Sequence, residues 1–143
     1  MPGVLVRFSF LVQGVFAELS QELDLTPQQA QLLCVIRGTS VSMAELAYRM
    51  GLERSSLTGL VDRAHRHGLV ARVNDADDRR IVRVSLTDDG RRTAERFHAE
   101  VSRRLGGLLD DLPEPLRTQV GVGLCAVVTR RQVPALLADE PDA

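Results

Sequence analysis

The chain has 143 residues, of which 44% are hydrophobic, and a formal net charge of -1 at pH 7. This length and composition fit one domain with a core of its own, which excludes an intrinsically disordered chain. A net charge this close to zero argues by itself against a nucleic-acid partner, although all 18 basic residues are arginine and the segment 49–83 holds eight of them against five acidic residues.

The first predicted element is a helix over residues 4–23, which has apolar side chains at helical spacing and further ones at Val4, Val6 and Phe10. A helix that is apolar on more than one side needs a second partner, which predicts a dimer interface. Arg7, Glu18 and Glu22 interrupt its apolar run, and no small-residue cleavage site follows. We therefore expect no membrane span, no signal peptide and a cytoplasmic protein.

The next three helices have recognisable start and stop signals. Thr26 and Gln29 form a capping box for a helix that ends near Arg37, before Gly38. Ser42 and Glu45 form a second predicted capping box, for a short helix that ends at Gly51. A polar start at Glu53 leads into a third helix that ends before Gly68. Two short helices joined by a tight turn predict a helix-turn-helix.

Two short runs, 69–73 and 81–86, are rich in β-branched residues and predict the strands of a hairpin, with a polar turn over 74–80. Thr87 caps a helix over about 88–110, and a final helix over about 114–137 again carries more apolar residues than one face requires. The segment 139–143 is predicted to be a loose tail.

Several motifs resemble those of the MarR family. The wing signature is Asp78-x-Arg80 followed by Leu86-Thr87-x-x-Gly90, and the helix-turn-helix segments are Met43–Ala47 and Ser55–Arg63, followed by Gly68-Leu69-Val70. The resemblance is strong over about 26–92 and architectural elsewhere. It implies a mainly α fold with a small β-hairpin wing, in which one domain (1–143) has a winged helix-turn-helix at about 26–92 and dimerisation helices at about 1–25 and 93–138.

The resemblance implies a homodimeric transcriptional regulator, a repressor, that binds a pseudo-palindromic operator in double-stranded DNA. A recognition helix needs one buried face, here Leu57, Leu60, Val61 and Ala64, and short or basic side chains toward the major groove. The resemblance makes Arg80 the minor-groove residue and Asp78 its orienting partner. The candidate DNA-binding residues are Arg54, Ser55, Ser56, Thr58, Arg63, Arg66, Asp78, Arg79 and Arg80.

Structural roles without DNA contact remain open for these residues, and other functions remain open for the chain. The outward side of the recognition helix could be an ordinary solvated face, and Asp78 with Arg80 could be only a turn-stabilising pair. The whole chain could also be a winged-helix module for protein interaction, or a ligand-binding protein without operator binding. Duplex DNA binding discriminates among these functions.

The sequence gives little sign of other chemistry. Cys34 and Cys125 lie in apolar helical patterns and are expected to be buried free thiols, since two cysteines make neither a disulfide framework nor a four-ligand metal site. The peroxide-sensing branch of the family carries its cysteine in the first helix, which here has none, so that mechanism is not expected. His65 and His67 point about 200° apart on a helix and cannot share a metal. No enzyme motif occurs, no cofactor is expected, and the resemblance allows an unidentified small aromatic effector.

Overall fold

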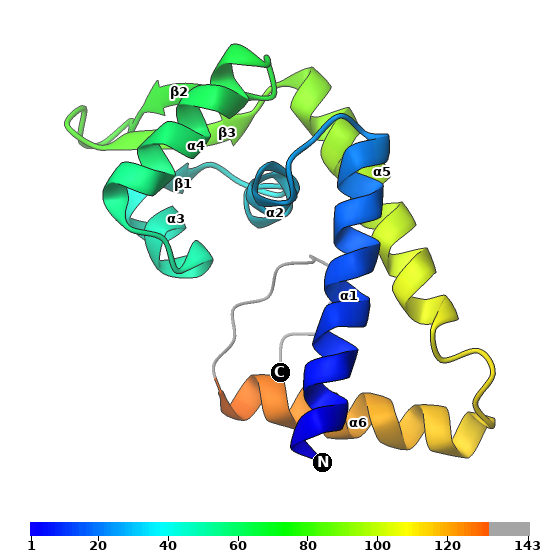
Figure 1. Ribbon diagram of the computed structural model, residues 1–143. Helices are drawn as coiled ribbons and strands as arrows, with labels where there is room; N and C mark the ends of the chain where they lie inside the picture. The colour runs from blue at the N-terminus through cyan, green and yellow to red at the C-terminus, as the bar shows by residue number, and fades with distance from the viewer. Residues whose placement is uncertain (132–143) are drawn as a thin grey trace.

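The computed structural model describes residues 1–131 as six helices and a three-stranded sheet (Figure 1). The elements in chain order are α1 (Pro2–Glu22), α2 (Pro27–Val35), β1 (Val41–Ser42), α3 (Met43–Met50), α4 (Arg54–Arg66), β2 (Val70–Asn74), β3 (Val82–Leu86), α5 (Asp88–Gly107) and α6 (Glu114–Arg130). This arrangement confirms the winged helix-turn-helix fold expected from the sequence.

The predicted caps set the helix starts. At α2 the Thr26 hydroxyl accepts the Gln29 N–H at 3.1 Å, and the Gln29 side chain accepts the Thr26 N–H at 2.9 Å, so the capping box is complete. Ser42 accepts the Glu45 N–H at 3.2 Å at the start of α3. The second half of that box does not form, because the Glu45 carboxylate pairs with Arg49 instead.

The sheet has one strand more than the sequence predicted. Its order is β1-β3-β2, all antiparallel, with Val41 opposite Val84 and Arg72 also opposite Val84 on the other side. The strand β1 contains only two residues, too few to show an alternating pattern, and it exists because it pairs with β3. The wing is therefore hydrogen-bonded to the segment that leads into α3.

The core lies around α2, which contacts α1, α3, α4 and α5. Phe97 of α5 is fully buried, and its ring meets that of Phe16 edge-on with the centroids 5.4 Å apart. At the same junction Arg104 donates to the Glu22 carboxylate at 2.7 and 3.0 Å. The long helix α5 is thus fixed to the end of α1 by both packing and charge.

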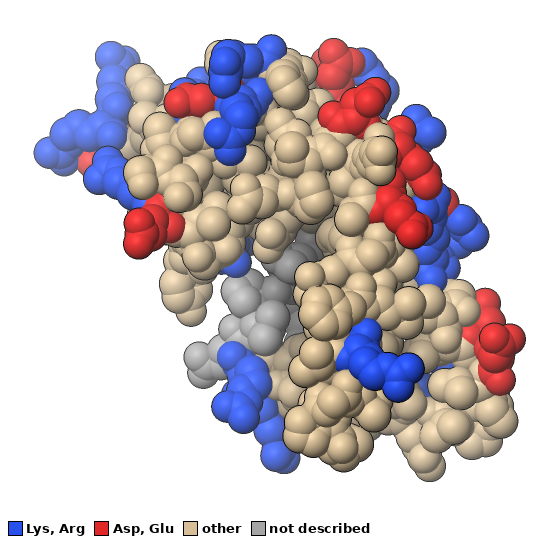
Figure 2. Space-filling model, viewed as in Figure 1, with Lys and Arg blue, Asp and Glu red and all other residues tan. Residues whose placement is uncertain are grey.

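Helices α1 and α6 leave much of their apolar surface uncovered. Only Leu19 and Ser20 of α1 are buried, whereas Phe10 is 66% exposed, and no residue of α6 is buried. By length and mean hydropathy (1.4) α1 could cross a membrane, although composition of this kind also occurs in helices covered by protein. Figure 2 shows a largely uncharged surface over this part of the molecule.

Two expectations at the C-terminal end need correction, and two others fall outside the described residues. Helix α5 ends at Gly107 rather than near 110, because the chain continues in tight turns toward Pro113. Helix α6 is described to Arg130, and the predicted extension to 137 lies outside the described residues, as does the tail at 139–143. Cys125 is exposed in the single chain because α6 packs none of its side chains into the core, whereas Cys34 is buried as predicted.

Gly90 holds the start of α5 against the end of the helix-turn-helix. Thr87 caps α5 by accepting the Gly90 N–H at 3.0 Å, and its hydroxyl donates to the Gly68 carbonyl at 2.6 Å. A Cβ on Gly90 would lie 1.8 Å from the Leu69 carbonyl oxygen. Only glycine allows this backbone contact.

We expect Gly90→Ala to lower the free energy of unfolding by about 3 kcal/mol or more, because two backbone segments would have to separate. Gly106→Ala is the matched control in the same helix, since a Cβ there meets nothing within 4 Å. It should raise the stability by about 0.5–1 kcal/mol. Urea unfolding measures both, and equal effects of the two substitutions would contradict the close contact at Gly90.

Candidate nucleic-acid interface

Helix α4 presents a polar face beside the wing. It begins at Arg54, three residues after Gly51, whose φ of 61° ends α3 in the left-handed conformation. Leu57, Leu60, Val61 and Ala64 are buried, as predicted for the inner face. The outer face is exposed and contains all six α4 candidates: Arg54, Ser55, Ser56, Thr58, Arg63 and Arg66.

Two of these side chains are partly constrained by the helix itself. The Thr58 hydroxyl donates to the Arg54 carbonyl at 2.8 Å, which orients its oxygen for accepting a further bond. The Arg63 guanidinium lies back along the helix, 3.4 Å from the place where a Gly59 Cβ would be. A side chain at position 59 would therefore compete with Arg63 for space.

The wing carries an arginine held in place by a carboxylate. Asp78 accepts two bonds from the Arg80 guanidinium, both at 3.0 Å, and the Arg80 N–H at the same distance. The Arg80 hydrogen bond lowers the pKa of the Asp78 carboxyl below its ordinary value. The Arg80 side chain is nevertheless 89% exposed, so it is oriented by protein and open to a partner.

A second carboxylate organises the wing turn. Asp75 accepts the N–H groups of Asp77 and Asp78 at 2.9 and 3.2 Å, and these bonds, with that of Arg83, lower its pKa. Arg83 bridges to it at 3.0 Å and donates to the hydroxyl and carbonyl of Ser40 at 3.0 and 2.8 Å. Arg83 therefore fastens the wing to the segment before β1 and has few N–H groups left for a ligand.

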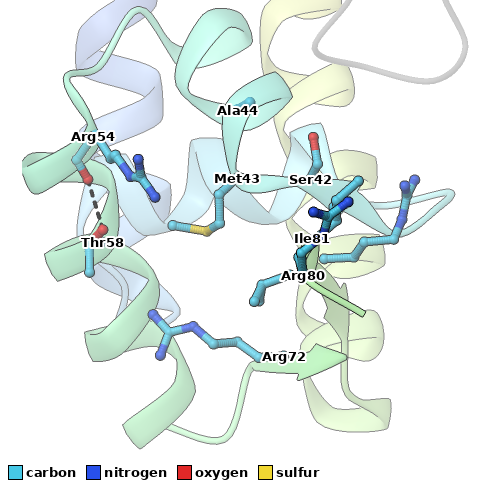
Figure 3. A pocket seen from close by; sticks show the side chains of 10 residues that line it. Ser42, Met43, Ala44, Arg54, Thr58, Arg72, Arg80 and Ile81 are labelled. Atoms are coloured by element: carbon cyan, nitrogen blue, oxygen red, sulfur yellow. Dashed lines mark hydrogen bonds between the residues drawn. The ribbon is translucent and has the colours of Figure 1, made fainter. Parts of the chain in front are cut away.

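A cavity of about 540 Å³ separates α4 from the wing. Arg54 and Thr58 line it from α4, Arg72 from β2, and Arg80 from the wing, around the apolar side chains of Met43 and Ile81 (Figure 3). A second cavity, of about 630 Å³, lies at the start of α4 against Glu53, Arg54, Ser55 and Thr58. Figure 2 shows the basic side chains gathered over the wing and α4.

The structure thus brings some of the predicted residues together and leaves others apart. Arg54, Ser55, Thr58 and Arg80 line the two cavities, whereas Ser56, Arg63, Arg66, Asp78 and Arg79 lie outside them. Arg72 was missed as a site residue. Its signal was strand alternation, because Val70, Arg72 and Asn74 share one side of β2, and a charge beside a buried valine needs a partner.

The two histidines of α4 and the turn after it have separate partners. His65 Nδ1 lies 3.0 Å from the Val70 carbonyl, and His67 Nδ1 lies 3.4 Å from the Gln29 amide, so the two rings turn to separate partners. Within residues 1–131 no three His, Cys, Asp or Glu side chains are placed to hold a metal ion. Burial raises the pKa of the Cys34 thiol to about 11.

Comparison with known proteins connects this arrangement to one family. A model described as MarR family matches residues 23–81. The transcriptional repressor MdtR of Bacillus subtilis is 32% identical over 94 residues, which are 63% of this chain and 61% of MdtR. The chain therefore spans about three fifths of the length of the curated relatives it matches.

Solved structures match over more of the chain. A MarR family protein from Bacillus stearothermophilus has a TM-score of 0.82 and 26% identity, with 92% of both chains covered. CouR from Rhodococcus jostii RHA1, bound to p-coumaroyl-CoA, has a TM-score of 0.72 and 27% identity over 87% of this chain and 88% of CouR. The similarity thus extends over the terminal helices as well as the central lobe.

The buried Cys34 predicts an unreactive thiol. With a pKa of about 11, only about 1 in 10,000 Cys34 side chains is thiolate at pH 7. In a Cys125→Ser variant we expect iodoacetamide to modify Cys34 slowly at pH 7 and faster as the pH rises toward 11. A Cys34→Ser variant reports Cys125 alone, and rapid labelling of folded Cys34 at neutral pH would contradict the prediction.

Proposed function

This chain belongs to the MarR family, and from that premise we propose that it is a DNA-binding transcriptional repressor. In this proposal the chain acts as one domain over 1–143, with the DNA-binding part at about 26–92. Named relatives regulate transcription and are not enzymes, and we propose no catalytic role for this chain. The site of action would be the cytoplasm.

One observation carries the proposal. Arg80 donates two bonds to Asp78 yet remains 89% exposed, and it stands across a cavity from Arg54 at the start of an exposed polar helix. An oriented guanidinium suits the narrow minor groove, because its planar head is weakly hydrated. Helix α4 fits the adjacent major groove through its short side chains Ser55, Ser56 and Thr58.

The remaining candidates have supporting roles in this proposal. Arg63 and Arg66 lie farther along α4, and Arg79 lies next to Arg80, all exposed. We assign them to backbone phosphates, which fix the position of the protein without reading sequence. Asp78 orients Arg80 and makes no direct base contact.

The exposed apolar surface of α1 and α6 supports a homodimer. Phe10 and Val4 of α1 and Val122 and Val127 of α6 are each more than half exposed in the single chain. Apolar patches of this kind on a monomer mark an interface. A two-fold axis would place two copies of α4 about one or more turns of DNA apart, which is roughly 34 Å per turn, and would explain a pseudo-palindromic operator.

A small ligand would release the operator in this proposal. CouR was solved with p-coumaroyl-CoA, and a bound ligand that favours one separation of the two α4 helices would lower the affinity for DNA. We propose an aromatic effector as the class of compound to screen. No residue of this chain is assigned to it.

We expect Arg80→Ala to weaken binding to an operator, selected by the wild-type protein from a randomised duplex pool, by about 1–3 kcal/mol per half-site. Arg54→Ala should weaken it as well. Arg80→Lys keeps the charge but loses the planar head, so it should retain nonspecific binding and lose most of the operator preference. Fluorescence anisotropy at two salt concentrations measures these effects.

Arg103→Ala serves as the control, because Arg103 is an exposed arginine of α5 that is paired with Glu100, far along the chain from the wing. It should bind the operator as the wild type does. Weak binding that is equal for every duplex and for every variant would refute the repressor and favour the winged-helix module for protein interaction.

We expect the full chain to sediment as a dimer at micromolar concentration and Phe10→Glu to shift it toward monomer, because the charge would enter the apolar interface. Tyr48→Glu is the matched control, since Tyr48 is a 78% exposed aromatic residue outside α1 and α6. A wild-type chain that is monomeric in buffer, or that floats with lipid vesicles through α1, would contradict the dimer.

A further inference from the structure

We propose that Arg72 binds one phosphate group of the DNA backbone in the cavity between α4 and the wing, and that Asp62 positions it. The ligand class is a phosphodiester anion. This inference rests on the proposed function, because it assumes that α4 and the wing enter neighbouring grooves. Neighbouring grooves are separated by one sugar-phosphate backbone, which would have to pass through the cavity between the two elements.

Arg72 reaches this cavity from β2, and Arg54 reaches it from α4 on the opposite side. Its position in the strand is opposite Val84, whose side chain is fully buried, so Arg72 starts from the packed side of the sheet and extends along it. The guanidinium Nη2 lies 2.6 Å from the Asp62 carboxylate, and the side chain is 34% exposed. Figure 3 shows the guanidinium turned toward α4.

Two other arginines of the cavity already have partners within the wing. Arg83 donates to Asp75 and Ser40, and Arg80 donates to Asp78 at the exposed wing. Within residues 1–131 Arg54 has no ion-pair partner, and Arg72 has an ion pair with Asp62 alone. These two guanidiniums, from opposite walls, therefore have N–H groups free for an anion between them.

A phosphate group suits this pair of donors. Guanidinium presents its N–H groups in a plane that matches two oxygens of one phosphate, and a charged pair of this type is stronger than neutral hydrogen bonds. Asp62 pairs with Arg72 Nη2 at 2.6 Å and keeps the charged end of the side chain beside α4, so that less side-chain entropy is lost on binding. Asp62 is thus a positioning residue, and Arg72 makes the contact.

A purely structural role for Arg72 makes a different prediction. If the ion pair with Asp62 only joins α4 to β2, replacing Arg72 lowers the melting temperature and leaves the salt dependence of DNA binding unchanged. If Arg72 neutralises a phosphate, replacing Arg72 also means that the counterion of that phosphate is no longer released on binding. The slope of log K against log salt separates these two roles, because it counts the neutralised phosphates.

The first experiment measures this slope for a random-sequence duplex with the wild type, Arg72→Gln and Arg49→Gln. Arg49 is the matched control, since its ion pair with Glu45 has side-chain exposures of 33% and 44%, against 34% and 47% for Arg72 and Asp62. We expect the slope to fall by about 0.9 per bound protomer in Arg72→Gln. It should stay at the wild-type value in Arg49→Gln.

The two proposals fail in different ways. A wild-type protein without salt-dependent duplex binding would refute the repressor and the phosphate site together. Wild-type binding with a full slope that Arg72→Gln retains would refute only the assignment of Arg72. Circular dichroism and thermal melting establish that the variants are folded at the assay temperature.

A second measurement does not depend on Arg72→Gln being folded. The Arg72 Nε–H resonance of the wild-type protein is assigned by its absence from the spectrum of Arg72→Lys. We expect this resonance to shift when the random-sequence duplex is added, while the corresponding resonance of Arg49 stays in place. An Arg72 resonance that does not move on DNA binding would overturn the proposal.

Discussion

The contact between Gly90 and Leu69 connects the two parts of the molecule. Helix α4 ends at Arg66, the chain turns through Gly68, and Leu69 leads into the sheet with its carbonyl against the first turn of α5. Thr87 adds one bond to each side of this contact, to Gly68 and to Gly90. The direction of α5 is therefore set by the same residues that end the helix-turn-helix. Because α5 also packs on α1, a change in the angle between terminal helices would be transmitted to α4 through a backbone contact that leaves no room for a side chain.

The wing depends on polar contacts where the rest of the fold depends on apolar packing. Asp75 accepts two N–H groups of the turn. Arg83 donates both to the Asp75 carboxylate and to Ser40, and so links the turn to the segment before β1. A hairpin alone is marginally stable in water. Pairing with β1 and the bridge through Arg83 give it a fixed position relative to α3 and α4, which the proposed recognition of two adjacent grooves would require. Asp75 and Arg83 thus fix the position of the wing, whereas Arg79 and Arg80 remain exposed to solvent.

Local signals in the sequence were enough for the helices and the hairpin, because each was specified by neighbouring residues. The capping box at Thr26, the glycine at 51 and the alternation from Val82 to Leu86 each act within a few positions. The features that sequence reasoning missed depend on residues far apart in the chain. Strand β1 requires Val84, the bridge of Arg83 spans 43 positions to Ser40, and Arg72 becomes a cavity residue only when α4 supplies Asp62. Cys125 was misplaced for the opposite reason: its helix is apolar, but within residues 1–131 none of that helix is buried.

The near-zero net charge and the basic face are consistent once the pairing of each arginine is considered. Three of the four arginines around the cavity have an aspartate partner: Arg72 with Asp62, Arg80 with Asp78, and Arg83 with Asp75. Each carboxylate reduces the local positive potential and therefore the nonspecific attraction to DNA. In return, hydrogen bonds to Asp78 and Asp75 hold the guanidiniums of Arg80 and Arg83 in place, which in the proposed function would reduce the entropy lost when DNA is bound. Under that proposal the interface has lower general affinity and higher geometric selectivity, and selectivity is the quantity that limits a repressor among many competing sites.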